Sequence, residues 1–129
     1  MSETETNELL PQRIFPTLRS TDWAATQAFY AKAGFDVIFE WRDAPDFPVY
    51  AGLLGHGVAF HVSEHDGDCQ PGGSVAIYVD DVDATHATLA GLGLNPPAPE
   101  DMPWGDRMFT VEDPDGNSVS FFTPNPDES

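Results

Sequence analysis

An internal repeat constrains this chain more than any other feature of its sequence. Shifting the sequence by 59 residues aligns 22–35, DWAATQAFYAKAGF, with 81–94, DVDATHATLAGLGL. Identical residues occur at 22/81, 25/84, 26/85, 28/87, 31/90 and 34/93. The chain has 129 residues, which is the size of one ordinary domain, so the repeat indicates one domain built from two copies of the same supersecondary unit.

Each copy of the repeat predicts a helix with defined ends. Asp22 and Asp81 are good N-cap residues, because an aspartate side chain accepts hydrogen bonds from the backbone N–H groups that a first helical turn leaves unpaired. The alanine, glutamine and leucine residues that follow favour helix. Gly34 and Gly93 stand where a left-handed residue commonly ends a helix, and an apolar residue follows each of them.

Short apolar segments on either side of the helices predict strands. One strand precedes each helix and three follow it, which gives the order βαβββ twice and an α+β fold class. The expected strands are 14–19, 35–42, 47–54 and 57–63 in the first unit, and 75–79, 95–100, 107–112 and 117–123 in the second. Turns rich in Gly, Asp, Asn and Pro are expected at 55–57 and 113–117, before the two final strands. The chain therefore divides into a disordered tail at 1–11, a first module at 12–69, a second module at 70–123 and a C-terminal tail at 124–129.

The charge of the chain limits its partners. There are 22 acidic and five basic residues, which give a formal net charge of −17. This charge repels phosphate backbones and anionic membranes, so neither nucleic acid nor a membrane is an expected partner. A cationic ligand would be attracted over a long range, although acidic residues spread along the whole chain also fit a role in solubility or a high-salt habitat. A single cysteine, and an acidic N-terminus unlike a signal peptide, favour a cytoplasmic location.

Three segments carry a resemblance to a known family: TDWAATQAFYAKAGF, VAIYVDDVDATHATLAGLG and PWGDRMFTVEDPDGNSVSFF. Together with the doubled βαβββ order, they resemble the vicinal-oxygen-chelate superfamily, also called the glyoxalase/bleomycin-resistance/dioxygenase fold. The resemblance extends over residues 14–123. It implies two modules whose curved mixed sheets form a cup with side chains pointing inward, and it implies a homodimer.

In enzymes of this superfamily, a divalent metal sits in the cup and is held by His, Glu or Gln side chains from the first and last strands of the modules. The offset of 59 residues places those positions at Phe15 and Ser74 in the first strands, and at His61 and Ser120 in the last strands. Phenylalanine cannot bind a metal, and neutral serine hydroxyls are weak ligands compared with imidazole or carboxylate. We therefore expect no metal, no other cofactor and no catalytic residue.

Two details resemble the bleomycin-resistance proteins within this superfamily. Pro16 follows Phe15, which stands at the first-strand position of a metal ligand. The first strand of the bleomycin-resistance proteins also carries a proline, and that strand is exchanged between two subunits. Trp104 and Gly105 match a Pro-Trp-Gly motif whose tryptophan lines a drug cleft at the dimer interface. Aromatic rings would stack on a planar ligand, and acidic loop residues would complement a cation. The candidate ligand-binding residues are Trp104, Gly105, His61, Phe60, Tyr78, Phe47, Asp43 and Asp46.

The sequence leaves three interpretations open. The favoured one is a non-catalytic protein that binds and sequesters an antibiotic-type small molecule, such as a cationic, bleomycin-like drug. The second is a metal-dependent enzyme of the glyoxalase or dioxygenase type with an atypical ligand set. The third is a structural or regulatory module that binds a metabolite or a protein partner. The sequence contains neither the GxSxG motif of a nucleophile elbow nor the GxxxxGKS motif of a phosphate loop.

Overall fold

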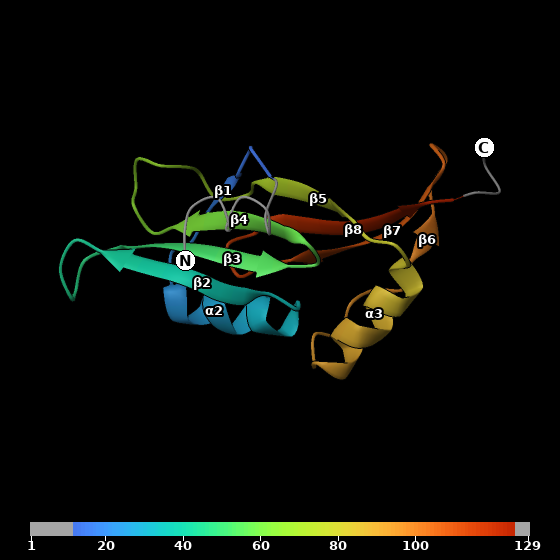
Figure 1. The fold of residues 1–129 in the computed structure, drawn as a ribbon, viewed down its shortest axis with the longest axis horizontal. Coiled ribbons are helices and arrows are strands. Elements are labelled where there is room, and N and C mark those ends of the chain that lie inside the picture. Colours follow the sequence, from blue (N-terminus) through green and yellow to red (C-terminus); the bar gives the residue numbers. More distant parts are fainter. Residues whose placement is uncertain (1–11, 126–129) are drawn as a thin grey trace.

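The computed structural model describes residues 12–125, so the tail expected at 1–11 and most of the tail expected at 124–129 lie outside the described residues. The described chain forms two four-stranded sheets, with the strand order β1-β4-β3-β2 in the first and β5-β8-β7-β6 in the second (Figure 1). The elements are β1 (Thr17–Arg19), α2 (Trp23–Lys32), β2 (Asp36–Arg42), β3 (Val49–Gly55), β4 (Val58–Ser63), β5 (Ser74–Tyr78), α3 (Val82–Gly91), β6 (Glu100–Asp101), β7 (Asp106–Glu112) and β8 (Ser118–Pro124). β1 pairs in parallel with β4, and β5 pairs in parallel with β8, while the other pairs are antiparallel. This arrangement confirms the predicted α+β fold of two βαβββ units.

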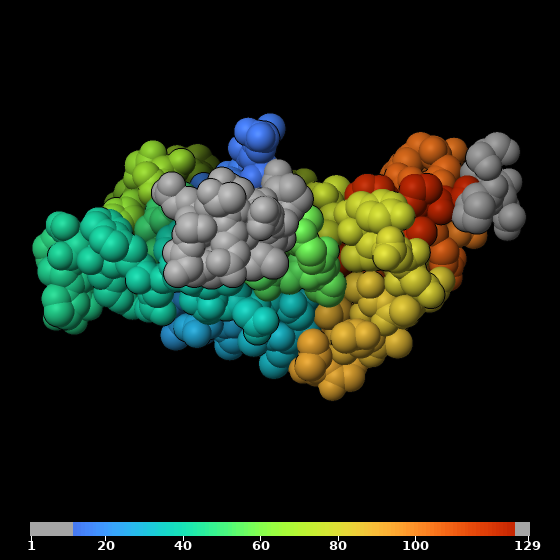
Figure 2. Space-filling model, in the orientation of Figure 1, coloured from blue at the N-terminus to red at the C-terminus, as the bar shows by residue number. Residues whose placement is uncertain are grey.

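The two units, here called the first module (β1 to β4 with α2) and the second module (β5 to β8 with α3), lie next to each other along the long axis of the molecule (Figure 1). Both helices lie on one side of the sheets, at the bottom of that view. The space-filling view has the same elongated outline, with the first module at one end and the second at the other (Figure 2). Each sheet therefore has one face toward a helix and one face that no helix of residues 12–125 covers.

The helix ends follow the sequence prediction. The side chain of Asp22 accepts a hydrogen bond from the backbone N–H of Ala25 at 3.3 Å, and that of Asp81 accepts one from Ala84 at 3.1 Å. After the two helices, Gly34 and Gly93 have φ values of 89° and 95°. These are left-handed conformations that only glycine adopts readily, which explains why the chain can turn back toward the sheet at both positions.

The strand register reproduces the 59-residue offset of the repeat. Thr17 pairs with His61 between β1 and β4, and Ala76 pairs with Ser120 between β5 and β8. The second pair therefore lies 59 residues after the first on both strands. The antiparallel register of β3 and β4 is set by the tight turn that joins them. In this turn His56 and Gly57 have φ values of 54° and 79°, as in a two-residue type I′ hairpin.

Two predicted strands are shorter in the structure. The strand expected at 95–100 is wrong over most of its length, because β6 contains only Glu100–Asp101. The segment before β6 carries prolines at 96, 97 and 99, which cannot donate the backbone hydrogen bonds of a sheet. The strand expected at 14–19 is confined to Thr17–Arg19, after Pro16, although the carbonyl of Pro16 still accepts a 2.8 Å bond from the N–H of His61.

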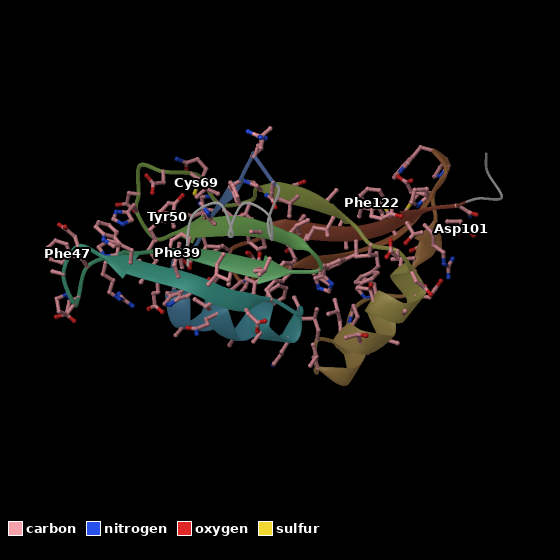
Figure 3. All side chains as sticks on the ribbon, viewed as in Figure 1. Phe39, Phe47, Tyr50, Cys69, Asp101 and Phe122 are labelled. Atoms are coloured by element: carbon pink, nitrogen blue, oxygen red, sulfur yellow. The ribbon has the colours of Figure 1, made fainter. Side chains whose placement is uncertain are left out.

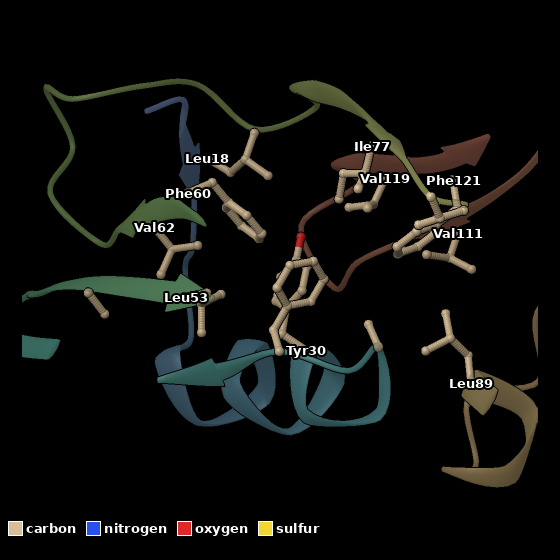
Figure 4. Packing of buried hydrophobic residues seen from close by; sticks show 14 of the residues in the cluster. Leu18, Tyr30, Leu53, Phe60, Val62, Ile77, Leu89, Val111, Val119 and Phe121 are labelled. Atoms are coloured by element: carbon tan, nitrogen blue, oxygen red, sulfur yellow. The ribbon is translucent and has the colours of Figure 1, made fainter. Parts of the chain in front are cut away.

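One hydrophobic core joins the helix-facing sides of both sheets. Its largest fully buried apolar side chains are Tyr30, Phe60, Phe121, Leu53, Leu89, Val49, Val62 and Val119. They come from α2, α3 and the strands of both modules (Figure 4), so neither module has a separate core.

The turn between β7 and β8 connects the two modules through buried polar groups. Asp113 is buried and accepts hydrogen bonds from the hydroxyl of Tyr30 at 2.7 Å and from Nδ2 of Asn117 at 2.9 Å. The same Asn117 amide donates to the carbonyl of Arg19 at 2.9 Å, and Thr21 donates through its backbone N–H to Asp115 at 3.1 Å. The 113–117 segment is thus the hairpin turn predicted from sequence, and in addition it binds the second module to the first.

Candidate binding surface

Aromatic side chains gather on the face of the first sheet that α2 does not cover. We call this the aromatic face and define it by Phe15, Phe39, Trp41, Tyr50 and His61. Phe39 pairs with Gly52 and Trp41 pairs with Tyr50 across β2 and β3, while Gly52 pairs with His61 across β3 and β4. Alternate residues of a strand lie on the same face, so these pairings place the four β2, β3 and β4 side chains together. Trp41 is 53% exposed and Phe39 is 39% exposed, which leaves much of this aromatic surface open to solvent.

A bulge in β2 brings the aromatic residues onto this face. The register between β2 and β3 shifts between Val37, which pairs with Leu53, and Phe39, which pairs with Gly52. Without the extra residue, Val37 and Phe39 would point the same way. With it, Val37 packs against the core and Phe39 lies on the opposite side of the sheet. The bulge therefore separates the part of β2 that serves the core from the part that forms the aromatic face.

Gly52 allows the ring of Phe39 to lie flat against the sheet. A Cβ atom at position 52 would lie 2.3 Å from Cε2 of Phe39, which is closer than atoms can approach. The ring of Phe39 stacks near that of Tyr50, with centroids 6.1 Å apart, and meets the ring of His61 edge-on at 5.3 Å. Figure 3 shows Phe39 and Tyr50 close together in the first module. The absence of a side chain at Gly52 thus gives the aromatic face its flat centre.

His61 is the polar group at the centre of the aromatic face. Its Nδ1 atom lies 2.9 Å from the hydroxyl of Tyr50, and its ring stacks on that of Phe15, with centroids 5.2 Å apart. Partial burial lowers the pKa of His61 from its usual value, because removal from water disfavours the charged imidazolium. His61 is therefore a neutral hydrogen-bonding group at neutral pH.

The uncovered face of the second sheet has a different character. The hydroxyls of Thr110 and Ser120 lie 2.7 Å apart, and Ser74 is exposed on β5. Toward the other end of the strands, Tyr78 is 54% exposed and meets the ring of Phe122 edge-on at 5.9 Å. Between the two modules, Tyr78 also lines a cavity of about 180 Å³ together with Gln12, Pro16 and residues of β4 and β5. Around Thr110 and Ser120, the second module thus offers hydroxyl groups where the first offers rings.

The resemblance implies metal ligands at four positions, which are occupied by Phe15, His61, Ser74 and Ser120. Phenylalanine and serine are poor metal ligands, and the structure does not make up for them. Phe15 covers His61, and the hydroxyl of Ser120 is engaged by Thr110. Within residues 12–125, no three His, Cys, Asp or Glu side chains converge in a way that could hold a metal ion. The residues of one chain therefore do not fit the metal centre of the superfamily's enzymes, and no catalytic step through a metal follows from them.

The predicted ligand-binding residues fall into separate groups. Trp104 and Gly105 lie in the loop between β6 and β7, in the second module, where Trp104 is 66% exposed and donates through Nε1 to Asp106 at 3.1 Å. No ring contact or hydrogen bond joins Trp104 to His61 in the described part of the chain. Trp104 and His61 thus make no direct contact with each other in residues 12–125.

The predicted loop residues lie at the far end of the first module. Phe47, Asp43 and Asp46 are exposed in the loop between β2 and β3, and Arg42 donates to the carbonyl of Phe47 at 2.9 Å. Figure 3 shows Phe47 at the tip of this hairpin, at the end of the molecule opposite Asp101. The hairpin loop lies next to the aromatic face, since Trp41 is the last aromatic residue of β2 before the loop begins.

Phe60 points away from the aromatic face. Its side chain is 2% exposed, and its ring contacts those of Tyr30 and Phe35 in the core (Figure 4). The alternation of β4 explains this, because Phe60 and His61 are neighbours and must face opposite sides. Phe39 and Tyr50 were absent from the predicted set. Counting the register back from the turn at His56 and Gly57 could have placed Tyr50 beside His61, whereas the bulge that turns Phe39 outward has no clear signal in the sequence.

The chain belongs to the glyoxalase superfamily, because a family model described as a glyoxalase superfamily protein matches residues 2–127. Among solved structures, a bleomycin resistance determinant encoded on the transposon Tn5 is 26% identical, with a TM-score of 0.70 over 89% of this chain and 98% of that chain. A bleomycin-binding protein complexed with bleomycin is 25% identical, with a TM-score of 0.70 over 88% of this chain and 99% of that one. These findings confirm the resemblance inferred from the sequence.

A third solved structure shows the same fold at lower identity. TnmS3, an antibiotic binding protein from Streptomyces sp. CB03234, is 23% identical, with a TM-score of 0.70 over 88% of this chain and 97% of that chain. A comparison with curated protein sequences found no significant match. None of the helices in residues 12–125 is long and apolar enough to cross a membrane.

Proposed function

We propose that this protein binds an aromatic, antibiotic-type small molecule and sequesters it without changing it chemically. The observation that carries the proposal is the aromatic face, where Phe39 and Trp41 remain exposed around the part-buried His61. Exposed apolar patches with a polar centre commonly mark ligand or partner sites. Flat rings on a rigid sheet bind planar molecules by stacking, and they do so without a metal or a nucleophile.

The relatives support the same class of ligand. One of the similar structures is described as a bleomycin-binding protein in complex with bleomycin, and another as a bleomycin resistance determinant. The net charge of −17 would attract a cationic drug and raise its rate of encounter with the protein. Asp43 and Asp46, in the exposed hairpin next to the aromatic face, are the acidic groups we assign to a positively charged part of such a ligand.

We also propose that the working form is a homodimer. Trp104 lies in the second module and the aromatic face lies in the first, and no ring contact or hydrogen bond joins them in residues 12–125. A second copy could place its Trp104 loop over the aromatic face and close a cleft around the ligand. Sedimentation velocity at micromolar concentration tests this idea, and a protein that sediments as a monomer with and without ligand would contradict it.

Titration calorimetry with bleomycin and with simpler cationic aromatic drugs tests the binding function. We expect saturable heat with the wild-type protein and a loss of affinity in Trp41→Ala. Leu92→Ala is the matched control, because Leu92 is also exposed but follows α3 on the covered side of the second sheet. The absence of heat with every drug would overturn the proposal. A stoichiometric transition metal in protein purified without chelator would instead favour a metal-dependent enzyme.

A further inference from the structure

Three polar groups form a line across the aromatic face. The hydroxyl of Tyr50 lies 2.9 Å from Nδ1 of His61 and 3.4 Å from Oγ1 of Thr17. Thr17 and His61 are directly paired residues of β1 and β4, and Tyr50 reaches them from β3. All three side chains therefore stand on paired strands, which hold them in fixed positions.

The chemistry of these groups decides the direction of the hydrogen bonds. A phenol is a stronger acid than a neutral imidazole N–H, and an imidazole nitrogen is a stronger base than a phenol oxygen. Tyr50 therefore donates to Nδ1 of His61, and the oxygen of Tyr50 is left to accept from the hydroxyl of Thr17. When Nδ1 accepts a hydrogen bond, the proton of a neutral imidazole resides on Nε2.

The Nε2 atom of His61 is available to a ligand. No hydrogen bond in the described part of the chain involves it. It lies on the other side of the imidazole from Nδ1 and thus away from Tyr50. The rings of Phe15 and Phe39 flank the imidazole, the first stacked on it and the second edge-on. An N–H donor among apolar rings gains more from a hydrogen bond than one in water, because few water molecules compete for it.

We propose that Thr17 and Tyr50 fix His61 as the tautomer with a proton on Nε2, and that this N–H donates to a carbonyl oxygen of a planar aromatic ligand lying on the aromatic face. Tyr50 is a positioning residue in this arrangement, and His61 is the residue that touches the ligand. The inference rests on the proposed binding function and narrows it. It selects ligands whose aromatic system carries a hydrogen-bond acceptor over ligands that offer only a donor at that point.

The tautomer can be measured without any ligand. Two-bond ¹H–¹⁵N correlation spectra of the neutral imidazole distinguish a protonated Nε2 from a protonated Nδ1. We expect the Nε2–H pattern for His61 in the wild-type protein, and a mixture or the other tautomer in Tyr50→Phe, which keeps the ring but loses the donor. A dominant Nδ1–H tautomer in the wild-type protein, or a spectrum unchanged by Tyr50→Phe, would overturn the inference even if the protein binds drugs.

A pair of matched probes tests the contact itself. 9-Fluorenone and fluorene have nearly the same shape, but only the first carries a carbonyl oxygen. Equilibrium dialysis with protein in excess should show that His61→Phe weakens 9-fluorenone binding roughly three- to tenfold more than fluorene binding, which is the effect of one net hydrogen bond. His86→Phe is the control and should affect both probes equally, because His86 lies on α3, away from the aromatic face, where its ring meets that of Phe109 on β7 edge-on.

The outcomes separate the two proposals. If both probes bind and His61→Phe affects them equally, the contact is wrong and the binding function stands. If neither probe binds and the drugs give no heat, the binding function and the inference both fail. If the drugs bind but neither probe does, the inference is overturned. The inference requires the aromatic face to bind planar carbonyl compounds in general, and this result would show that it does not.

Discussion

The hydroxyl of Tyr30 on α2 donates a 2.7 Å hydrogen bond to Oδ2 of Asp113, in the turn between β7 and β8. Both residues are buried, and they belong to different modules. Burial first, and then the hydrogen bond to and the charge of the Asp113 carboxylate, raise the pKa of Tyr30, so the phenol keeps its proton and remains a donor at neutral pH. The bond gives the buried carboxylate of Asp113 one of the hydrogen-bond donors that replace the water molecules lost on burial.

We expect Tyr30→Phe to lower the free energy of unfolding by about 1–2 kcal/mol, because it removes a hydrogen bond to a charged group and leaves the packing of the ring unchanged. The loss should stay within this range, since Asn117 and the backbone N–H of Asp115 still donate to Asp113. Urea denaturation measures the effect. Tyr78→Phe serves as the control, because the Tyr78 ring is exposed and its hydroxyl makes no hydrogen bond within residues 12–125. Equal stabilities for the two variants would contradict the role of the bond.

Gly52→Ala tests the packing of the aromatic face. The new methyl group would collide with the ring of Phe39 and force it away from the sheet. We expect a loss of about 1–3 kcal/mol in the free energy of unfolding, typical of overpacking, together with weaker drug binding. Gly91→Ala is a matched control, since a Cβ at that position in α3 meets open space. A Gly52→Ala protein with unchanged Phe39 ring resonances would show that the ring does not lie where the structure places it.

The pH dependence of stability should contain a contribution from His61. Its folded-state pKa is lowered by burial, so the unfolded chain binds a proton more readily than the folded one. The stability that this group contributes is therefore lost as the pH falls below the usual histidine pKa of about 6.5, and is recovered as the pH rises through it. We expect the His61 ring resonance to titrate below pH ~6.5 in NMR spectra. In urea denaturation, His61→Phe should lose less stability than the wild-type protein between neutral and mildly acidic pH.

Trp104→Ala separates binding from folding. Trp104 is 66% exposed, and its only described hydrogen bond is to the neighbouring Asp106, so stability should change by no more than about 0.5 kcal/mol. If a second copy places this indole over the aromatic face, affinity for a cationic aromatic drug should fall by about tenfold or more. Calorimetry on the variant and on Leu92→Ala makes the comparison. An unchanged affinity would remove Trp104 from the binding surface and weaken the dimeric arrangement.

Much of the fold could be predicted because its signals are local. The aspartates and glycines at the ends of the two repeats fix the helices, and the two-residue turn at His56 and Gly57 fixes how β3 meets β4. The strand expected at 95–100 failed for a reason that was visible in the sequence. Its prolines lack the backbone N–H groups that could pair with β7, and the chain before β6 follows the surface without strand pairing.

The binding surface could be predicted only in part because its residues meet through non-local geometry. His61 followed from the repeat, but the outward turn of Phe39 depends on a bulge that only strand pairing reveals. The separation of Trp104 from His61 depends on how the two sheets lie next to each other, and no pattern within either module encodes that. Phe60 was named beside His61, although strand alternation alone sends it to the core.

The short segment from Asp113 to Asn117 has a consequence for the evolution and engineering of this architecture. Its side chains bond to Tyr30, Thr21 and the carbonyl of Arg19, so together with the shared core it holds one half of the molecule against the other. Chimeras that exchange second halves among relatives should keep these five residues together with the positions they bind. A hybrid that changes only one side of this junction would misalign the two halves and disturb the core that they share.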